Sequence, residues 1–457
     1  MQRRTFLKTS ALTTLGLAAG CAPAQPPGVI FKGWAYEPDL VRQNVDRFVQ
    51  QTGIPVAYQS VSGNYHDKMV ALFVSRTPLD CCYVRDDDFA EWVEAGWLRP
   101  YDDIPDIDIN IDEDDIFPYN LESMTYQGRR YGLPYYTDIS IWVYNHDMLQ
   151  AAGFDRSPTT LDELTEQAVK VKEAGLRAPD GLPLDYPITL NFRQSPTGFN
   201  TWWALNFASE VELFDDEFNP IFPDDKDQRA ERILQWLVDG INKHRIIDPN
   251  SLTANSSLRY SIGAGRQAYG LIDKYDLEWI NNRRNSAVVQ AHLKNRGVPQ
   301  DEQSYAKVLR MAPVPSLEPG LRGTLGWTRM YSLAAQCRPD KVAEAWRLMN
   351  FLGYKDADGD YYTARHWFKL RGLGFAFKSL LDDPDIIAQT QLWGDVDLIK
   401  EQANYARART NIMAPWFSDF TLYYQPEIQK VLLGQQSPRE GLGRINKRCR
   451  ELKREWS

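Results

Sequence analysis

The sequence predicts an α/β protein of two domains, each built on a mainly parallel β-sheet flanked by helices. Apolar stretches between residues 29 and 84 alternate as strand, helix, strand, helix, strand, which is typical of parallel sheets with crossover helices. A chain of 457 residues exceeds the usual size of one domain. No apolar run of 18 residues occurs beyond the extreme N-terminus, so we expect no internal transmembrane helix.

The first elements follow from the spacing of apolar residues. Residues 29–34 form a short β-like run. A helix comes next and ends at Gly53, and its apolar face is formed by Val41, Val45, Phe48 and Val49. Residues 54–61 alternate like a strand, residues 67–75 are typical of a helix, and residues 79–84 of a buried strand.

Later elements carry start signals or apolar stripes. Thr160 and Glu163 form a capping box that opens a helix, which we expect to end at Gly175. Stripes of apolar residues predict two more helices, over residues 342–352 and 442–452.

Charge and cysteine usage restrict the function. The net charge is −9, and a chain beginning at Cys21 would lose three basic residues and reach −12, which argues against nucleic acid as a partner. The four cysteines after Cys21 show no metal-ligand spacing, and the five His are scattered, so we expect neither a metal nor a cofactor. Cys81 and Cys82 should point to opposite faces of a strand. A bridge between Cys337 and Cys449 stays open.

The N-terminal segment MQRRTFLKTSALTTLGLAAGC predicts export. Its basic start and short apolar stretch are typical of a signal peptide over residues 1–20. RRTFLK resembles the twin-arginine export motif, and LAAGC resembles a lipobox with Ala18 in place of the usual Leu. The resemblance implies a lipid on Cys21, and residues 21–28 would form a flexible tether. Cleavage without a lipid is the alternative.

Five blocks along the chain resemble one family, the maltose-binding-protein-like extracellular solute-binding proteins (family 1) of ABC importers. In chain order they contain VIFKGWAYEPDLVRQNVDRFVQQTGIPVAYQ, SRTPLDCCYVRDDDFAEWVEAGWLRPYDD, GRRYGLPYYTDISIWVYNHDMLQAAGFDRSPTTLDEL, YSIGAGRQAYGLID and APVPSLEPGLRGTLGWTRMYSLAAQCRPDKVAEAWRLMNFL. Residues 175–230 show no family block. Together the five blocks span most of the chain.

The resemblance implies a two-lobed, hinged periplasmic-binding-protein fold of type II. Lobe 1 would comprise residues 29–138 and about 318–352, and lobe 2 residues 139–317 and about 353–457. The implied function is that of a monomeric, non-catalytic receptor outside the cytoplasm, anchored in the membrane through lipid at Cys21. It would bind a sugar or oligosaccharide between the lobes and deliver it to the membrane subunits of an ABC permease.

Aromatic and acidic residues at the expected strand ends are the candidate ligand contacts. A ring can stack on the C–H face of a sugar, and a carboxylate accepts hydrogen bonds from its hydroxyls. Polar residues that follow strands of a parallel sheet gather at one edge. We therefore select Trp34, Tyr36, Glu37, Asp86 and Asp87, which lie at the ends of the first and third strands. The family resemblance implies further contacts at Tyr136, Asp138, Asp273, Tyr275 and Arg371. We add Trp202 and Trp203 as an aromatic platform of the second lobe, and Trp327 with Arg329 from a Gly-rich segment whose backbone can approach a ligand closely.

Other functions remain as alternatives. A receptor of the same fold could bind a polyamine, which would need several carboxylates, or a phosphorylated polyol, which would need Arg, Lys or a helix N-terminus. An exported carbohydrate-active enzyme would need two placed carboxylates, and none of the acids lies in a catalytic motif. A sensory or scaffold lipoprotein would bind no small molecule.

Overall fold

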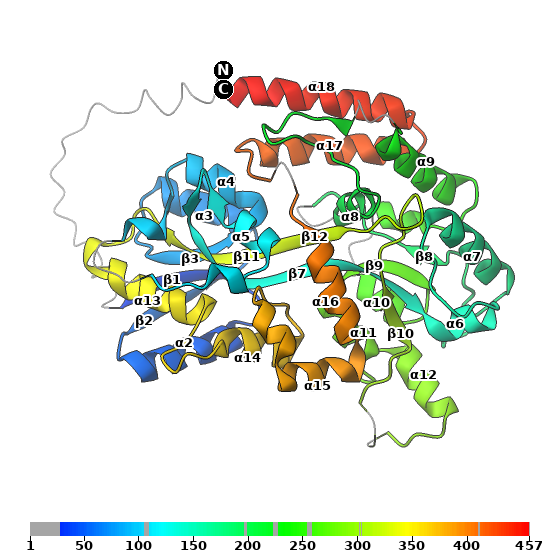
Figure 1. The fold of residues 1–457 in the computed structure, drawn as a ribbon, viewed down its shortest axis with the longest axis horizontal. Coiled ribbons are helices and arrows are strands. Elements are labelled where there is room, and N and C mark those ends of the chain that lie inside the picture. Colours follow the sequence, from blue (N-terminus) through cyan, green and yellow to red (C-terminus); the bar gives the residue numbers. More distant parts are fainter. Residues whose placement is uncertain are drawn as a thin grey trace.

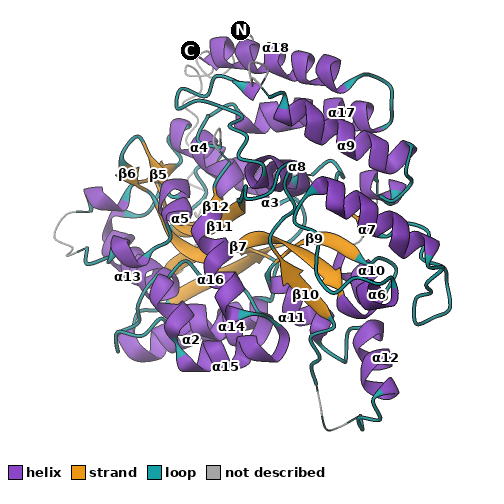
Figure 2. Ribbon diagram, turned by 45° about the vertical axis from the view of Figure 1, so that its right-hand side comes forward, coloured by secondary structure: helices purple, strands orange, loops and turns teal. Residues whose placement is uncertain are grey.

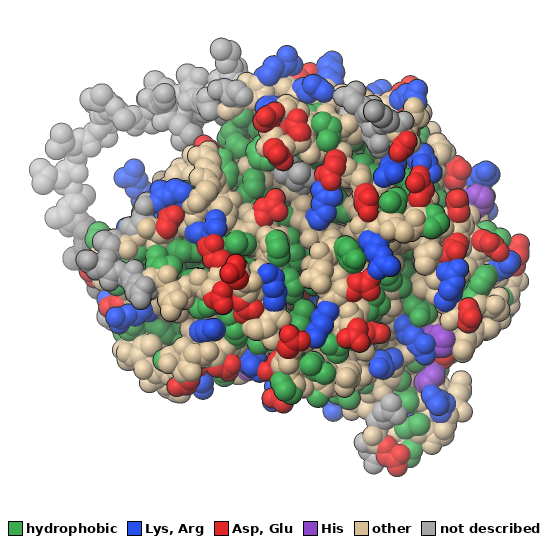
Figure 3. Space-filling model, viewed as in Figure 1, with side chains coloured by type: hydrophobic (Ala, Val, Ile, Leu, Met, Phe, Trp, Pro, Cys, Tyr) green, Lys and Arg blue, Asp and Glu red, His purple; other side chains and the backbone are tan. Residues whose placement is uncertain are grey.

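The computed structural model describes residues 28–104, 109–195, 199–222, 227–253, 258–300, 302, 304–409 and 412–456. The predicted signal peptide, Cys21 and most of the tether lie outside the described residues. Strands run through the middle of the molecule, and helices cover them on both sides (Figures 1 and 2). On the face drawn in Figure 3, acidic and basic side chains are interspersed.

The strands have the following bounds: β1 Val29–Trp34, β2 Val56–Val61, β3 Cys81–Arg85, β4 Leu98–Arg99, β5 Thr125–Tyr126, β6 Arg129–Arg130, β7 Gly132–Asn145, β8 Ile188–Thr189, β9 Tyr269–Asp273, β10 Leu309–Ala312, β11 Thr324–Ala334 and β12 Ala406–Arg407.

The α-helices have the following bounds: α2 Pro38–Thr52, α3 Tyr65–Val74, α4 Asp86–Glu94, α5 Pro118–Ser123, α6 His146–Ala151, α7 Leu161–Glu173, α8 Asn200–Ala208, α9 Arg229–Asn242, α10 Leu258–Gly263, α11 Tyr275–Asn281, α12 Ala287–Asn295, α13 Val342–Gly353, α14 Tyr362–Arg371, α15 Pro384–Trp393, α16 Val396–Tyr405, α17 Phe417–Leu432 and α18 Pro438–Trp456.

The predicted order of the first elements is confirmed. β1 has the predicted bounds, and α2 buries Val41, Val45 and Phe48 before it ends at Gly53, whose φ of 70° suits glycine. The α7 N-terminus is capped as predicted, because the Thr160 side chain accepts from the Glu163 amide at 3.2 Å. The Glu163 carboxylate in turn accepts a hydrogen bond from the Thr159 amide at 2.8 Å.

Two long strands, β7 and β11, hold the sheet together. The strand order is β2-β1-β3-β11-β7-β9-β8. β1 pairs in parallel with β2 and β3, and β8 pairs in parallel with β9, whereas the pairs that involve β7 with β9 and β11 with β3 or β7 are antiparallel. The α/β class is confirmed, but the sheet is mixed rather than mainly parallel as predicted, because the long central strands β7 and β11 run antiparallel to each other and to β9 and β3, respectively.

β7 changes its bonding along its length. Residues 132–139 pair with β11, and residues 140–144 pair with β9. The lobe boundary expected after residue 138 thus falls within one continuous strand. Apolar side chains on alternate positions of β7 join different cores: Ile141 and Val143 lie in one buried cluster, and Trp142 lies in the other.

The described cysteines are all free thiols. Cys81, Cys82, Cys337 and Cys449 are buried, and none forms a disulfide. The open question of a bridge between Cys337 and Cys449 is thereby answered in the negative. Within the described part of the chain, no helix combines the length and the apolar character that crossing a membrane requires.

Candidate ligand-binding site

The register of the central strands brings predicted site residues together. Trp327 on β11 lies opposite Asp138 on β7, and Asp273 on β9 lies opposite Ser140, two residues further along β7. As a result, the Trp327 indole Nε1 donates a hydrogen bond to Asp273 Oδ1 at 3.1 Å. Strand pairing thus brings together Trp327 and Asp273, which are 54 residues apart in the sequence.

Aromatic rings surround Trp327. Tyr136 and Tyr275 each meet its indole edge to face, with ring centroids 5.4 and 6.3 Å away, and the Arg329 guanidinium lies 4.8 Å from the ring centroid. We call Trp327, Tyr136, Tyr275, Asp273 and Arg329 the Trp327 cluster. Trp327 and Arg329 are buried, whereas the other three are half-buried and offer part of their surface to a ligand.

Two further aromatic residues come from β1 and the loop after it. Trp34 packs against Tyr83 and Tyr135, with centroids 4.5 and 5.6 Å away. Tyr36 stacks on Trp367 at 6.0 Å. Both predicted residues are half-buried.

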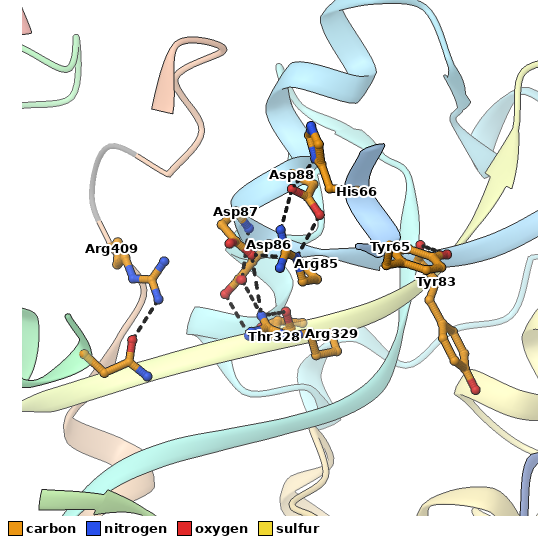
Figure 4. Close-up of polar contacts among 11 residues, drawn as sticks. Tyr65, His66, Tyr83, Arg85, Asp86, Asp87, Asp88, Thr328, Arg329 and Arg409 are labelled. Carbon is orange, nitrogen blue, oxygen red and sulfur yellow. Dashed lines mark hydrogen bonds and ion pairs between the residues drawn. The ribbon is translucent and has the colours of Figure 1, made fainter. Parts of the chain in front are cut away.

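The acidic run at residues 86–88 is buried, contrary to the solvated turn that such runs usually form. The three carboxylates occupy the first turn of α4, where the helix dipole favours negative charge. Asp86 accepts from the Arg329 guanidinium at 2.6 Å and from the Thr328 amide at 2.9 Å (Figure 4). Asp88 accepts two hydrogen bonds from Arg85, both at 2.8 Å. Cationic partners, Arg329 from a distant strand for Asp86 and the nearby Arg85 for Asp88, thus make the burial of these charges tolerable.

Three buried carboxylates on β7, β9 and α11 have pKa values above their usual range. Burial raises the pKa of Asp138 to about 7, although Lys274 lies 3.6 Å away and the amides of Ile139 and Tyr275 donate to it. Burial likewise raises the pKa of Asp276 to about 7, against the effect of Arg259 at 2.9 Å. The pKa of Asp273 is raised by burial as well, more than the Trp327 hydrogen bond lowers it.

Glu37 and Arg371 bind each other. The Arg371 guanidinium donates to both oxygens of the Glu37 carboxylate, at 2.7 and 2.9 Å, and Arg371 holds the pKa of that carboxyl below its usual range. Arg371 ends α14 and is exposed. The Arg371 side chain therefore forms a surface ion pair with Glu37.

The predicted contacts Trp202 and Trp203 lie on the buried helix α8. All residues of α8 from Thr201 to Ala208 are buried. Trp203 packs on Phe207 and Phe214 and donates its indole N–H to the Tyr424 hydroxyl at 3.3 Å. Both indoles belong to the second hydrophobic core, because that helix is enclosed on nearly every side.

Sequence reasoning missed Asn200 and Arg409. Asn200, at the start of α8, hydrogen-bonds Asp273 and accepts from the Arg409 guanidinium at 2.9 Å. Arg409 follows β12 and is only 4% exposed. No local pattern marks either residue, since their partners come from other parts of the chain. Among the described residues, no three His, Cys, Asp or Glu side chains are grouped to hold a metal ion.

Comparison with known proteins identifies the family. The model of the bacterial extracellular solute-binding proteins matches residues 34–357, which is 324 of the 457 residues. The chain belongs to this family, and the resemblance drawn from the sequence is confirmed.

Solved structures share the whole fold at low sequence identity. Maltose-bound MalE3 of T. maritima is 18% identical, with a TM-score of 0.73, over 93% of this chain and 99% of that one. The sugar-binding protein MalE of Xanthomonas citri is 19% identical, with a TM-score of 0.72, over 94% and 98% of the two chains. UgpB of Mycobacterium tuberculosis, in complex with glycerophosphocholine, is 14% identical, with a TM-score of 0.71, over 94% and 99%. The two-lobed α/β fold is therefore confirmed.

Proposed function

We propose that this protein is an extracytoplasmic receptor that binds a neutral sugar or polyol between its two lobes and delivers it to an ABC permease. Family membership supports a solute receptor. Structures of the same fold were solved with maltose and with D-mannitol, the latter for a protein of Agrobacterium vitis S4. These likenesses support the class of ligand.

The Trp327 cluster is the observation that carries the proposal. Its half-buried phenol rings can contact the C–H faces of a sugar, and the Asp273 carboxylate, oriented by Trp327 and Asn200, can accept from hydroxyls. A ring wall beside an oriented carboxylate is the arrangement that a polyhydroxylated molecule requires.

The charge balance favours a neutral ligand. Most carboxylates around the cluster already lie within 4.0 Å of a basic nitrogen, in the pairs Asp86–Arg329, Asp87–Arg85, Asp138–Lys274, Asp276–Arg259 and Glu37–Arg371. A polyamine would have to compete with these cations, and a phosphorylated polyol would meet the carboxylates. Both remain as alternative ligands in the test below.

The lobes are proposed to divide as the sequence indicates, with residues 29–138 and about 318–352 in one lobe and the remainder in the other. The change of β7 pairing after residue 139 supports a boundary there. Glu91 on α4 hydrogen-bonds the side chain of Ser418 on α17, and Figure 1 shows the two helices side by side. Such a contact between lobes would form when they approach each other around a ligand.

Export and anchoring complete the proposal. A signal peptide over residues 1–20 would direct the chain outside the cytoplasm, and a lipid on Cys21 would hold it at the membrane through the tether. The receptor would act as a monomer and without catalysis. Hydrolysis of a glycosidic bond needs one protonated and one free carboxyl group across the bond, whereas most acids here are held by cations.

A ligand panel tests this function. Purified protein is heated with maltose, D-mannitol, D-tagatose, putrescine or glycerophosphocholine, and the unfolding midpoint is recorded. A true ligand at a hundredfold excess over its Kd stabilises the folded state by about 2.7 kcal/mol. We expect this for a neutral sugar or polyol. A shift with putrescine or glycerophosphocholine alone would refute the carbohydrate assignment, and turnover of a sugar would refute the non-catalytic one.

A further inference from the structure

Arg409 is a buried cation without an ion-pair partner among the described residues. Its Nη2 donates to Asn200 Oδ1 at 2.9 Å, whereas its Nε is buried and has no hydrogen-bond partner. Burying a guanidinium donor that makes no bond is unfavourable, so such groups usually meet a partner. Asn200, which holds the guanidinium, also hydrogen-bonds Asp273 of the Trp327 cluster.

Asp87 is a buried acceptor that lacks a hydrogen bond. Its Oδ1 is buried and has no hydrogen-bond partner, and the nearest basic nitrogens are Arg85 Nε at 3.4 Å and Arg329 Nη1 at 4.0 Å. The neighbouring Asp86 and Asp88 are fully engaged by Arg329 and Arg85. Asp87 is therefore the member of the run that still has an accepting oxygen.

The two groups face the same region from different parts of the chain. Asp87 lies in the first turn of α4, whereas Arg409 precedes α17, and Figure 4 shows them on facing elements. Both charges act on the phenol of Tyr424: burial raises its pKa, Arg409 opposes the rise and Asp87 adds to it. One buried donor and one buried acceptor thus lie close to a common side chain beside the site.

We infer that Arg409 and Asp87 are specificity-determining residues that select hydroxyl groups, Arg409 donating to a ligand oxygen and Asp87 accepting from a ligand O–H. This inference rests on the proposed function. A hydroxyl both donates and accepts, so a vicinal diol satisfies both groups. A protonated amine can only donate and leaves Arg409 unpaired. A dianionic phosphate can only accept and leaves Asp87 unpaired.

The test combines probes with variants. Maltose, D-mannitol, putrescine and methyl phosphate are titrated calorimetrically into the wild-type chain and into the Arg409→Lys, Arg409→Met, Asp87→Asn and Arg409→Lys/Asp87→Asn variants. Arg407→Lys is the matched control, since Arg407 lies two residues away and pairs with Glu212 at 2.6 Å. Asp358→Asn is the matched acidic control, because the Asp358 side chain is 71% exposed. Unfolding midpoints without ligand report on folding.

We expect maltose or D-mannitol to bind the wild type, and each site variant to bind at least tenfold more weakly with an unliganded midpoint close to the wild type. The double variant should lose less than the product of the two single losses, because both groups engage one ligand. Controls should stay within twofold.

Two failures are distinguishable. If the wild type binds a neutral probe and the folded site variants bind it within twofold, the Arg409–Asp87 inference is wrong and the receptor function stands. If putrescine or methyl phosphate binds more tightly than both neutral probes, or no probe binds, the proposed function fails and the inference with it. The comparison among probes needs no variant, so it decides even if Arg409→Lys and Arg409→Met do not fold.

Discussion

Replacing Trp327 is the change that the structure makes most informative. Its indole is 4% exposed, meets Tyr136 and Tyr275 edge to face, and donates to Asp273 at 3.1 Å. Trp327→Ala would remove the indole on which the Tyr136 and Tyr275 rings pack, and it would also free the Asp273 carboxylate from its orientation. Trp327→Phe would keep the ring and remove only the N–H donor.

The expected magnitudes differ between the two variants. A hydrogen bond to a charged group contributes about 1.5–3 kcal/mol, and Asp273 is half-buried, so the lower end applies. Loss of that bond and of the ring contact in Trp327→Ala should weaken sugar binding at least tenfold, about 1.4 kcal/mol. Trp327→Phe loses only the hydrogen bond, about 1.5 kcal/mol, and should weaken binding about tenfold, less than Trp327→Ala. Emptying the buried site also lowers stability, by about 3–5 kcal/mol for Trp→Ala in a core, while the fold persists.

Calorimetric titration measures the affinities, and circular dichroism with thermal unfolding measures the fold. Trp236→Ala is the control, since that indole also donates a hydrogen bond, to Thr165 at 2.9 Å, away from the cluster. A Trp327→Ala chain that folds and binds its sugar within twofold of the wild type would remove Trp327 from the site. A loss as large in Trp236→Ala would show that the effect is one of general stability.

Three further predictions concern Asp138, Gly374 and the four described cysteines. Because the pKa of Asp138 is raised to about 7 in the folded chain, the folded state keeps a proton that the unfolded chain has released between about pH 4 and 7, and this group makes stability fall as pH rises. Asp138→Asn removes this dependence on pH. Denaturant unfolding should therefore show that the free energy of unfolding of the variant, relative to that of the wild type, increases by about 2–3 kcal/mol from pH 5 to pH 8. The same difference between variant and wild type at both pH values would contradict the raised pKa. Gly374→Ala would place a Cβ 2.1 Å from the Thr137 carbonyl oxygen, so its unfolding free energy should drop by at least about 1–3 kcal/mol, whereas Gly443→Ala, with open space around it, should change little. The four described cysteines should resist a thiol reagent in the native chain and all react after denaturation; a missing pair of thiols under non-reducing conditions would reveal a disulfide.

Amphipathic elements could be predicted from the sequence because their pattern is local. The β1 strand and the α2 helix are specified by apolar spacing and by Gly53, and the structure reproduces them. The family resemblance then supplied the order of the segments and directed attention to Trp327 and Asp273. Strand pairing brings those two side chains into direct contact.

Other parts of the site depend on contacts that no local pattern encodes. The buried state of Asp86 depends on Arg329, 243 residues further along the chain, so the acidic run alone could not show that this carboxylate is engaged by a guanidinium. Arg409 carries no motif, and only the fold places it beside Asn200. Adjacent tryptophans look alike in sequence, and only the enclosure of α8 shows that Trp202 and Trp203 are core residues.

A crystal structure of the chain with maltose or D-mannitol, whichever the titration shows to bind, would test the central claim most directly. We predict density for the ligand against Trp327 and Tyr136, with ligand hydroxyls within hydrogen-bond distance of Asp273, Asp87 and the Arg409 guanidinium. Ligand density elsewhere, with the Trp327 cluster making no contact to it, would contradict the account.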